Sequence, residues 1–553
     1  MNAAEAAGRV LAALGCRTAF GVVGSGNFHL TNALVAAGTR FVAARHEAGA
    51  VTMADAHARL TGSVGLVTVH QGPGLTNTVT GVAEAAKSRT PLIVVAGEAT
   101  DERSNFHIDQ AGLVESVGGL SVRLGSGASV VAEVVDLVRT ARTARLPVLF
   151  NLPLDVQREE AAFGPEQEAR IAQALADGLT LTGPQAASTV DGGAGADELA
   201  RKLGAAERPV FIAGRGARHA RRPLEELADR TGALLATSAV AKGLFRGSPW
   251  DLDVSGGFAT PLAAELIRGA DLVVAWGCAL TMWTTAHGKL LPPGAEVIQV
   301  DADEAALGRN RPVSAGVVGD VAAVAARVAA ELDRPAGGYR SPELAERIAR
   351  EGRWRCVPYE DESGAGRIDP RTLSIGLDDV LPAERVLATD SGNFMGYPAM
   401  FIDVPDERGF CFTQGFQSIG LGLATAIGAA LAQPDRLPVA ALGDGGALMG
   451  IAELETVVRL GLPMVIVVYD DEGYGAEVHH FRGEPMQTVT FPPTDFAALA
   501  AGYGCAAVTV TGPDDLAGVA EWVKGARERP LLVHAKVTRE HGSWWLEEAF
   551  KGH

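Results

Sequence analysis

Cysteine is scarce in this 553-residue chain, and the few thiols are scattered. The five cysteines are Cys16, Cys278, Cys356, Cys411 and Cys505, and none forms a CxxC pair. The sequence therefore predicts neither a zinc site nor a disulfide framework. Unpaired thiols are typical of a reducing compartment, which favours a cytoplasmic location.

Positive charge and long apolar runs are also lacking. The 48 Lys and Arg residues stand against 66 Asp and Glu residues, for a net charge of −18. This balance argues against binding to nucleic acid or to an anionic membrane. No apolar run reaches membrane-spanning length, and the first residues lack the basic start and apolar core of a secretion signal. We therefore expect neither nucleic acid nor membrane as a partner.

Apolar strand patterns alternate with helical patterns along the whole chain, which indicates parallel α/β sheets. A length of 553 residues with 47% hydrophobic residues is too large for one core. We expect three doubly wound α/β domains at residues 1–160, 201–333 and 371–553, with linkers at 161–200 and 334–370. Similar apolar segments close the first and last domains, at Arg145–Asp155 and Arg529–Val537, so we expect these two domains to be distant structural repeats.

Two acidic loops in the last third each follow an apolar strand pattern. Gly443-Asp444-Gly445 comes first, and Asp470-Asp471 follows the next strand. In a βαβ unit the right-handed crossover brings both loops to the carboxyl edge of the sheet. Two carboxylates there suit Mg²⁺, which takes its other oxygen ligands from a substrate phosphate. The alternative is two unrelated acidic turns.

At these residues the chain resembles the thiamine diphosphate (ThDP) enzymes of the acetolactate synthase, pyruvate decarboxylase and benzaldehyde lyase superfamily. The likeness spans nearly the whole chain. It implies that the side chains of Asp444 and Asp471 and the carbonyl of Gly473 ligate Mg²⁺, which bridges to the cofactor diphosphate. The family usually has Asn-Asn where this chain has Asp470-Asp471. The three domains would then be a pyrimidine-binding domain, a Rossmann-like central domain and a diphosphate-binding domain.

Far upstream, an apolar strand pattern leads into Arg45-His46-Glu47 and then into a helical stretch of small residues. By resemblance, Glu47 is the catalytic carboxylate that binds the aminopyrimidine ring of the cofactor and starts removal of the thiazolium C2 proton. Such a carboxylate needs a pKa tuned by burial. The alternative is a carboxylate that a helix N-terminus favours, but its coexistence with the acidic pair favours catalysis.

Other motifs supply further contacts to the cofactor and the substrate. A turn after a strand at Ser391-Gly392-Asn393 could cradle phosphate oxygens, and Ile419 stands where the family places the large aliphatic residue that bends the cofactor. The resemblance implies cofactor contacts at Glu47, Gly72, Asn77, Ser391, Gly392, Asn393, Gly415, Ser418, Ile419, Asp444, Gly445, Gly446, Asp471, Gly473 and Tyr474. Beside Glu47, it implies catalytic side chains at His29, Gln71, Glu477 and His480. For His29 and for the 477–480 stretch, the alternatives are a capping histidine and a solvated helix start.

The central block contains Gly214-Arg215-Gly216 after a strand pattern. This is a weak signal for a dinucleotide, since the full glycine spacing and a ribose-binding acid are not both present. Some relatives bind FAD or ADP in this domain, and we predict neither.

The resemblance implies a ThDP- and Mg²⁺-dependent carboligase or decarboxylase that acts on a 2-oxo acid through ylide and enamine intermediates, as acetolactate synthase does, with a second carbonyl compound as acceptor. A benzaldehyde lyase-like acyloin lyase or ligase and a simple 2-oxo acid decarboxylase are alternatives. A non-catalytic ThDP- or nucleotide-binding regulator and an NAD-dependent oxidoreductase are alternatives of another class. By resemblance, Glu47 and the metal loops of one site come from different subunits, so we expect a homodimer or a dimer of dimers.

Overall fold

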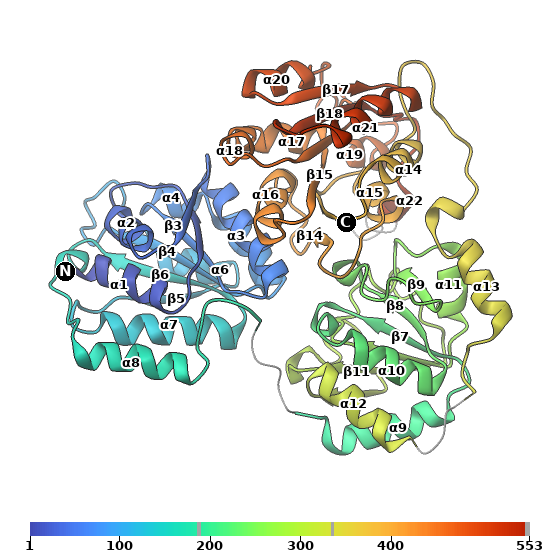
Figure 1. Cartoon of the computed structure of the whole chain (residues 1–553), viewed down its shortest axis with the longest axis horizontal. Helices are drawn as coiled ribbons and strands as arrows, with labels where there is room; N and C mark the ends of the chain where they lie inside the picture. Colours follow the sequence, from blue (N-terminus) through green and yellow to red (C-terminus); the bar gives the residue numbers. More distant parts are fainter. Residues whose placement is uncertain (185–189, 333–336, 548–553) are drawn as a thin grey trace.

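The computed structural model describes residues 1–184, 190–332 and 337–547, which form three lobes (Figure 1). Each lobe is built on a six-stranded sheet in which every paired neighbour is parallel. Helices flank each sheet. The prediction of three doubly wound α/β domains is therefore confirmed. Among the described residues, no helix is both long and apolar enough to span a bilayer.

The first sheet has the strand order β2-β1-β3-β4-β6-β5. Every residue of β3 and β6 is buried, as is typical of parallel strands covered by helices on both faces. The strands are β1 (Thr18–Gly21), β2 (Arg40–Ala43), β3 (Gly65–Val69), β4 (Leu92–Glu98), β5 (Leu120–Arg123) and β6 (Pro147–Pro153). The helices are α1 (Ala3–Ala13), α2 (Phe28–Ala36), α3 (Glu47–Thr61), α4 (Pro73–Thr76), α5 (Val79–Lys87), α6 (Gln110–Ser116), α7 (Val130–Ala144) and the 3₁₀ turn η1 (Val156–Arg158).

The third sheet has the order β14-β13-β15-β16-β18-β17. Numbered within its own domain, this is the same order as in the first sheet, so the predicted structural repeat is present. The strands are β13 (Arg385–Thr389), β14 (Phe410–Phe412), β15 (Leu437–Gly443), β16 (Val465–Asp470), β17 (Ala506–Val510) and β18 (Leu531–Lys536). The helices are α14 (Pro370–Val380), α15 (Gly396–Phe401), α16 (Gly422–Ala432), α17 (Asp444–Gly450), α18 (Glu453–Arg459), α19 (Gly475–His480), α20 (Phe496–Tyr503), η6 (Pro513–Asp515), α21 (Leu516–Lys524) and α22 (Trp544–Glu547).

The central sheet has the order β12-β11-β10-β7-β8-β9, which is the strand order of dinucleotide-binding folds. The Rossmann-like prediction is confirmed at the level of the fold. The strands are β7 (Pro209–Ala213), β8 (Leu234–Thr237), β9 (Asp251–Val254), β10 (Leu272–Trp276), β11 (Glu296–Asp301) and β12 (Ala315–Val318). Around them lie α9 (Gly193–Ala205), η2 (Arg215–Ala217), α10 (Arg221–Thr231), η3 (Ala239–Ala241), α11 (Pro261–Arg268), η4 (Glu304–Ala306) and α12 (Val321–Glu331).

The two stretches expected as linkers contain helices where the structure describes them. Residues 161–200 hold α8 (Pro165–Ala176), whose Ile171 and Ala174 are buried in the core of the first domain, and the start of α9. Residues 334–370 hold α13 (Pro342–Glu351) and η5 (Trp354–Cys356), and Ile348 packs into the central core. A few apolar residues at helical spacing are enough to attach an Ala- and Glu-rich segment to a domain. The exact domain bounds stay predictions.

The first and third domains share one hydrophobic cluster, in which α3 packs against α16 (Figure 1). Gly428 allows the close approach, because a Cβ at this position would lie 2.2 Å from the carbonyl oxygen of Met53. Helix α3 begins at Glu47, and α16 follows the loop that contains Ile419. This packing therefore fixes the position of one predicted site segment relative to another.

Candidate active site

The two acidic loops of the third domain meet at the carboxyl edge of its sheet. Asp444 begins α17 directly after β15, and Asp471 follows β16, the adjacent strand. The two carboxyl groups lie in contact, and Asp444 Oδ2 accepts a hydrogen bond from the amide of Gly473 at 3.0 Å. The predicted convergence of Asp444, Asp471 and Gly473 is thus present in the structure.

This acidic pair is electrostatically unfavourable on its own. Burial, with the nearby carboxylates of Asp471 and Asp470, raises the pKa of Asp444. Burial also raises the pKa of Asp471. Two buried carboxylates in contact disfavour each other's charged form, and a cation between them would reverse this effect. Among the described residues, no cluster of three or more His, Cys, Asp or Glu side chains is arranged as a metal site, so a cation here would need backbone or phosphate oxygens as further ligands.

Asp470, the other departure from the family's Asn-Asn, has a different role. Its Oδ2 lies 2.7 Å from Nε2 of His534 on β18, and both side chains are buried. Its Oδ1 accepts a hydrogen bond from the amide of Glu472, a residue with a φ of 60°. Asp470 therefore ties the acidic turn to the neighbouring strand, a contact that sequence analysis missed because His534 is 64 residues away.

A buried aspartate, Asp390, connects the turn after β13 with the loop before α16. It accepts hydrogen bonds from the amides of Ser391 and Gly420, both at 2.9 Å. Burial raises its pKa to about 6, although these amides lower it. The sequence analysis missed Asp390, and its place at a strand end directly before Ser391 is the signal that could have identified it.

The turn at Ser391-Gly392-Asn393 lies beside the acidic turn. A Cβ on Gly475 would meet both Asp471 Oδ2 at 2.1 Å and Cβ of Asn393 at 3.1 Å. The Asn393 side chain is held by the hydroxyl of Ser543, which donates to its Oδ1 at 2.6 Å. The C-terminal segment before α22 therefore braces this edge of the third sheet.

Glycines leave a cradle around the start of α17. A Cβ on Gly445 would lie 2.5 Å from the ring of Tyr474, and one on Gly446 would lie 2.4 Å from Asp390 Oδ2. Backbone amides at such a strand-to-helix turn can approach phosphate oxygens closely. The carboxylate pair, the glycine cradle and the Ser391 turn together fit a diphosphate with a divalent cation.

Glu47 lies at the carboxyl edge of the first sheet as the first residue of α3. Its Oε2 accepts a hydrogen bond from Nδ2 of Asn77 at 2.9 Å, so two predicted cofactor contacts come together. Gly72, another predicted contact, has a φ of 60°, and its amide donates to Oε1 of Gln110 at 2.9 Å. The buried Gln110 side chain thereby fixes the turn that runs past Glu47.

Three polar side chains of the first domain, His70, His29 and Gln71, differ in how they are placed. His70 accepts a hydrogen bond at Nδ1 from the amide of Gly26 at 3.2 Å and packs edge-on against Phe106. Burial lowers the pKa of His70 against the opposite effect of the Glu47 carboxylate. His29 is exposed on α2. Gln71 is 3% exposed, and its Oε1 lies close to Gly26 and Gly97 without a hydrogen bond.

The remaining predicted residues lie on α19. Glu477 is half-buried and His480 is exposed, with its ring edge-on to Phe481 at 4.5 Å. His479 packs against Gly542 and lies 3.0 Å from the guanidinium of Arg482. Helix α19 therefore contacts the C-terminal segment that also braces Asn393. The catalytic roles predicted for His29, Gln71, Glu477 and His480 stay predictions.

Comparison with known proteins matches all three domains to one family. The descriptions that match are the N-terminal TPP binding domain of thiamine pyrophosphate enzymes at residues 1–115, the central domain at 196–328 and the C-terminal TPP binding domain at 390–535. Thiamine pyrophosphate (TPP) and ThDP are the same molecule. The matched ranges contain both Glu47 and the acidic pair.

Curated relatives match along most of the chain. A sulfoacetaldehyde acetyltransferase of Rhodobacter capsulatus is 30% identical over 506 residues, which cover 86% of this chain and 83% of the relative. The large subunit of acetolactate synthase isozyme 2 of Escherichia coli is 26% identical over 99% of this chain and 97% of its own. A probable 2-ketoarginine decarboxylase of Pseudomonas aeruginosa is 29% identical over 93% of this chain and 90% of its own. With this coverage and with the acidic pair and Glu47 at the matching sheet edges, the chain belongs to the thiamine pyrophosphate enzymes, which make or break carbon–carbon bonds.

Proposed function

We propose that this enzyme is a ThDP- and Mg²⁺-dependent carboligase or decarboxylase of a 2-oxo acid, similar to acetolactate synthase. The observation that carries the proposal is the contact of Asp444 with Asp471 at adjacent strand ends, next to the Ser391 turn. The names of the relatives support the reaction class, since they include an acetolactate synthase and a decarboxylase. A cytoplasmic location is part of the proposal, supported by five free cysteines.

Each residue has a defined task in this proposal. Asp444, Asp471 and the carbonyl of Gly473 hold Mg²⁺, and the amides around Gly445 and the Ser391 turn hold the diphosphate. ThDP, when bound, supplies the electron sink for cleavage next to a carbonyl. Glu47, oriented by Asn77, holds and moves the proton at the aminopyrimidine ring. The substrate-side residues His29, Gln71, Glu477 and His480 select the acceptor and move protons.

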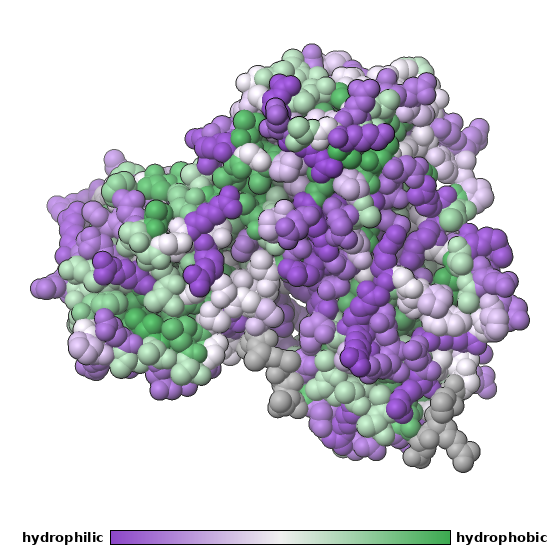
Figure 2. Space-filling view, in the orientation of Figure 1, coloured by the Kyte–Doolittle hydropathy of each residue, from purple (hydrophilic) through white to green (hydrophobic). Residues whose placement is uncertain are grey.

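The proposal includes a homodimer or a dimer of dimers with sites at the interface. Large apolar side chains are exposed beside the predicted site on the first domain, at Val23 (42%), Phe28 (50%) and Phe106 (41%). The third domain exposes Leu448 (44%) and Met449 (58%) on α17, the helix that begins at Asp444. Hydrophobic surface is visible on both lobes in Figure 2. Apolar groups gathered at a polar site are typical of a surface that a partner covers, and a second copy of this chain is the partner proposed.

We expect Phe28→Glu to shift the protein toward the monomer and to lower its activity in the same proportion, because a charge at the interface would be buried without a partner. Sedimentation velocity at several protein concentrations measures the shift. Leu175→Glu is the matched control, since Leu175 is also exposed (42%) but lies on α8, away from the site. A Phe28→Glu protein with the same association state as the wild type would contradict the interface.

Product analysis tests the reaction. The protein incubated with pyruvate, Mg²⁺ and ThDP is expected to form acetolactate, which NMR detects directly. Acetaldehyde alone would establish a simple decarboxylase, and acetoin would point to an acyloin-forming enzyme. Pyruvate left unchanged would contradict the acetolactate synthase-like proposal and would direct the search to larger 2-oxo acids and 2-hydroxy ketones.

A further inference from the structure

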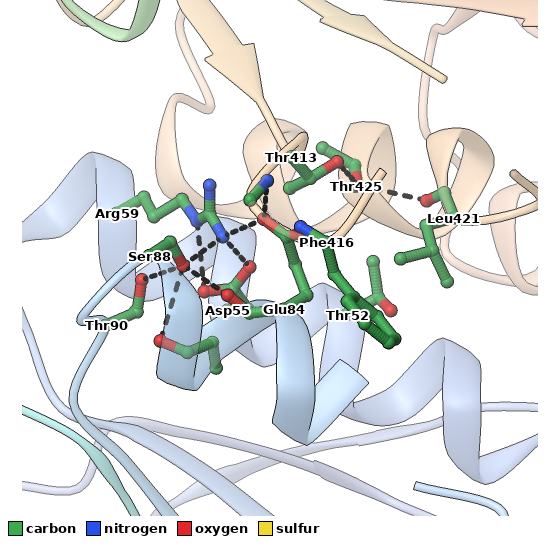
Figure 3. Close-up of polar contacts among 12 residues, drawn as sticks. Thr52, Asp55, Arg59, Glu84, Ser88, Thr90, Thr413, Phe416, Leu421 and Thr425 are labelled. Atoms are coloured by element: carbon green, nitrogen blue, oxygen red, sulfur yellow. Dashed lines mark hydrogen bonds and ion pairs between the residues drawn. The ribbon is translucent and has the colours of Figure 1, made fainter. Parts of the chain in front are cut away.

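A buried cluster of charged side chains lies where the first domain meets the third (Figure 3). Arg59, near the end of α3, lies between two carboxylates, with its guanidinium 2.6 Å from Asp55 and 2.7 Å from Glu84. The Arg59 side chain is 5% exposed and both carboxylates are 1% exposed. Burying charged groups this deeply costs desolvation free energy, which is offset only if the groups are paired and hydrogen-bonded.

Glu84 directs its carboxylate at the loop that precedes α16. Its Oε1 accepts a hydrogen bond from the amide of Gly415 at 2.9 Å, and its Oε2 accepts one from the amide of Phe416 at 2.6 Å. Arg59 binds the same loop from its other end, donating to the carbonyl of Phe412 at 3.0 Å. The loop is thus held by a side chain that is 331 residues away in the sequence.

The charge state of the cluster indicates which carboxylate does the holding. Burial raises the pKa of Asp55. For Glu84, burial also acts to raise the pKa, but Arg59 and the two loop amides outweigh it and lower the pKa overall. Glu84 is therefore the group that keeps its negative charge, and hydrogen bonds from backbone amides to a charged acceptor are stronger than those to a neutral one.

The loop itself has little else to fix it at this point. Gly415, Phe416 and Gln417 are exposed, and Gln417 has a φ of 62°. The Phe416 ring lies under the ammonium group of Lys87 at 5.5 Å, a weak contact at an exposed site. A Cβ on Gly415 would come within 3.1 Å of Glu84 Oε1, so glycine permits the carboxylate to reach the backbone.

The central domain joins at the same place. Arg218, just after η2 of the central domain, donates to the carbonyl of Arg59 at 2.9 Å. Arg215 donates to the carbonyl of Ser88, and Arg59 donates to the Ser88 hydroxyl at 2.6 Å. Contacts from all three domains therefore hold Arg59 in place, so the cluster is a rigid attachment for the loop that precedes α16.

We propose that Glu84 is a positioning residue for the cofactor: by holding the amides of Gly415 and Phe416, it sets the place of Ser418 and Ile419 before ThDP binds. This inference rests on the proposed function, which assigns residues 415–419 to the cofactor. Glu84 does not touch the cofactor and acts only through the loop.

The test is Glu84→Gln in the full-length protein with ThDP and Mg²⁺. Glutamine has nearly the same size but offers only one acceptor oxygen, so one loop amide would face an NH₂ group. Arg59 keeps its hydrogen bond to Asp55 at 3.0 Å, so the variant is expected to fold. We expect the apparent affinity for ThDP to fall about 10- to 100-fold, with kcat at saturating ThDP within about twofold of the wild type. Amide exchange of the peptide covering residues 413–418 is expected to become faster without cofactor.

Glu84→Asp is the second variant, which keeps the negative charge beside Arg59 but is one methylene too short to hold both amides. It is expected to show the same loss of ThDP affinity and the same faster exchange. Glu168→Gln, on the exposed surface of α8, is the matched control and should change neither. Unchanged exchange and unchanged ThDP affinity in both Glu84 variants would overturn the proposal.

Ile419→Ala separates failure of this inference from failure of the proposed function. If Ile419→Ala weakens catalysis or ThDP binding while the Glu84 variants do not, the loop binds the cofactor but Glu84 does not position it. If Ile419→Ala changes neither, the assignment of residues 415–419 to the cofactor is wrong, and the inference about Glu84 falls with it.

Discussion

Replacing Glu47 by glutamine is expected to lower kcat by about 100- to 10,000-fold, the range that a positioned proton-transfer group contributes. Glutamine fills the same space and can still accept the hydrogen bond that Asn77 donates at 2.9 Å. It cannot take up or release a proton. The affinity for ThDP should therefore change by only a few fold, and the loss should fall on kcat.

Steady-state kinetics at several ThDP concentrations, with binding measured separately by calorimetry, separate these two effects. Glu115→Gln is the matched control, since Glu115 is an exposed glutamate of the same domain. If Glu47→Gln kept more than about a tenth of the wild-type kcat, Glu47 would not be the group that handles the proton.

Replacing Asp444 by asparagine is expected to weaken Mg²⁺-dependent ThDP binding by about 100-fold or more. One oxygen of Asp444 already accepts a hydrogen bond from the amide of Gly473, so an asparagine that keeps this bond would present its NH₂ group, which is not a metal ligand, to the cation. Replacing Asp471 by asparagine restores the amide that the family usually carries, so binding should stay within a few fold of the wild type. The two substitutions remove the same charge from the same buried pair. Their difference therefore measures the ligand role and not the charge.

Without metal, Asp444→Asn is expected to raise the melting temperature, because it relieves two carboxylates buried in contact. With Mg²⁺ and ThDP, the wild type should be strongly stabilised by ligand binding and the variant should not. Differential scanning fluorimetry with and without both ligands measures these opposite changes. An Asp444→Asn protein that ThDP and Mg²⁺ stabilise as much as the wild type would contradict the metal assignment.

Much of the fold could be predicted from the sequence because contiguous stretches of residues determine the strands, the helices and the turns between them. The apolar strands and the acidic turns after β15 and β16 are contiguous segments, and the right-handed βαβ crossover then determines which turns become neighbours. Asp444 and Asp471 were found in this way. The sequence does not predict α8, because a segment rich in Ala and Glu suits a linker as well as a helix that buries only Ile171 and Ala174.

Contacts between distant segments could not be predicted. Glu84 and Gly415 belong to different domains, and no local pattern links a glutamate on α5 to the backbone of a loop. The same holds for Asp470 and His534. The orientation of Gln71 could not be predicted either. Its motif indicates a pocket residue, but its side chain lies against Gly26. That orientation depends on packing with residues distant in the sequence.

The shared strand order of the first and third sheets places their working loops at equivalent positions. The turn at Gly72 follows β3, and the turn at Asp444 follows β15, which is the same strand of the other repeat. The first sheet presents a neutral glycine turn beside the single carboxylate of Glu47, while the third presents two buried carboxylates, to which the proposal assigns a cation. In the proposed function, two sheets of the same topology would therefore bind opposite ends of a single small molecule.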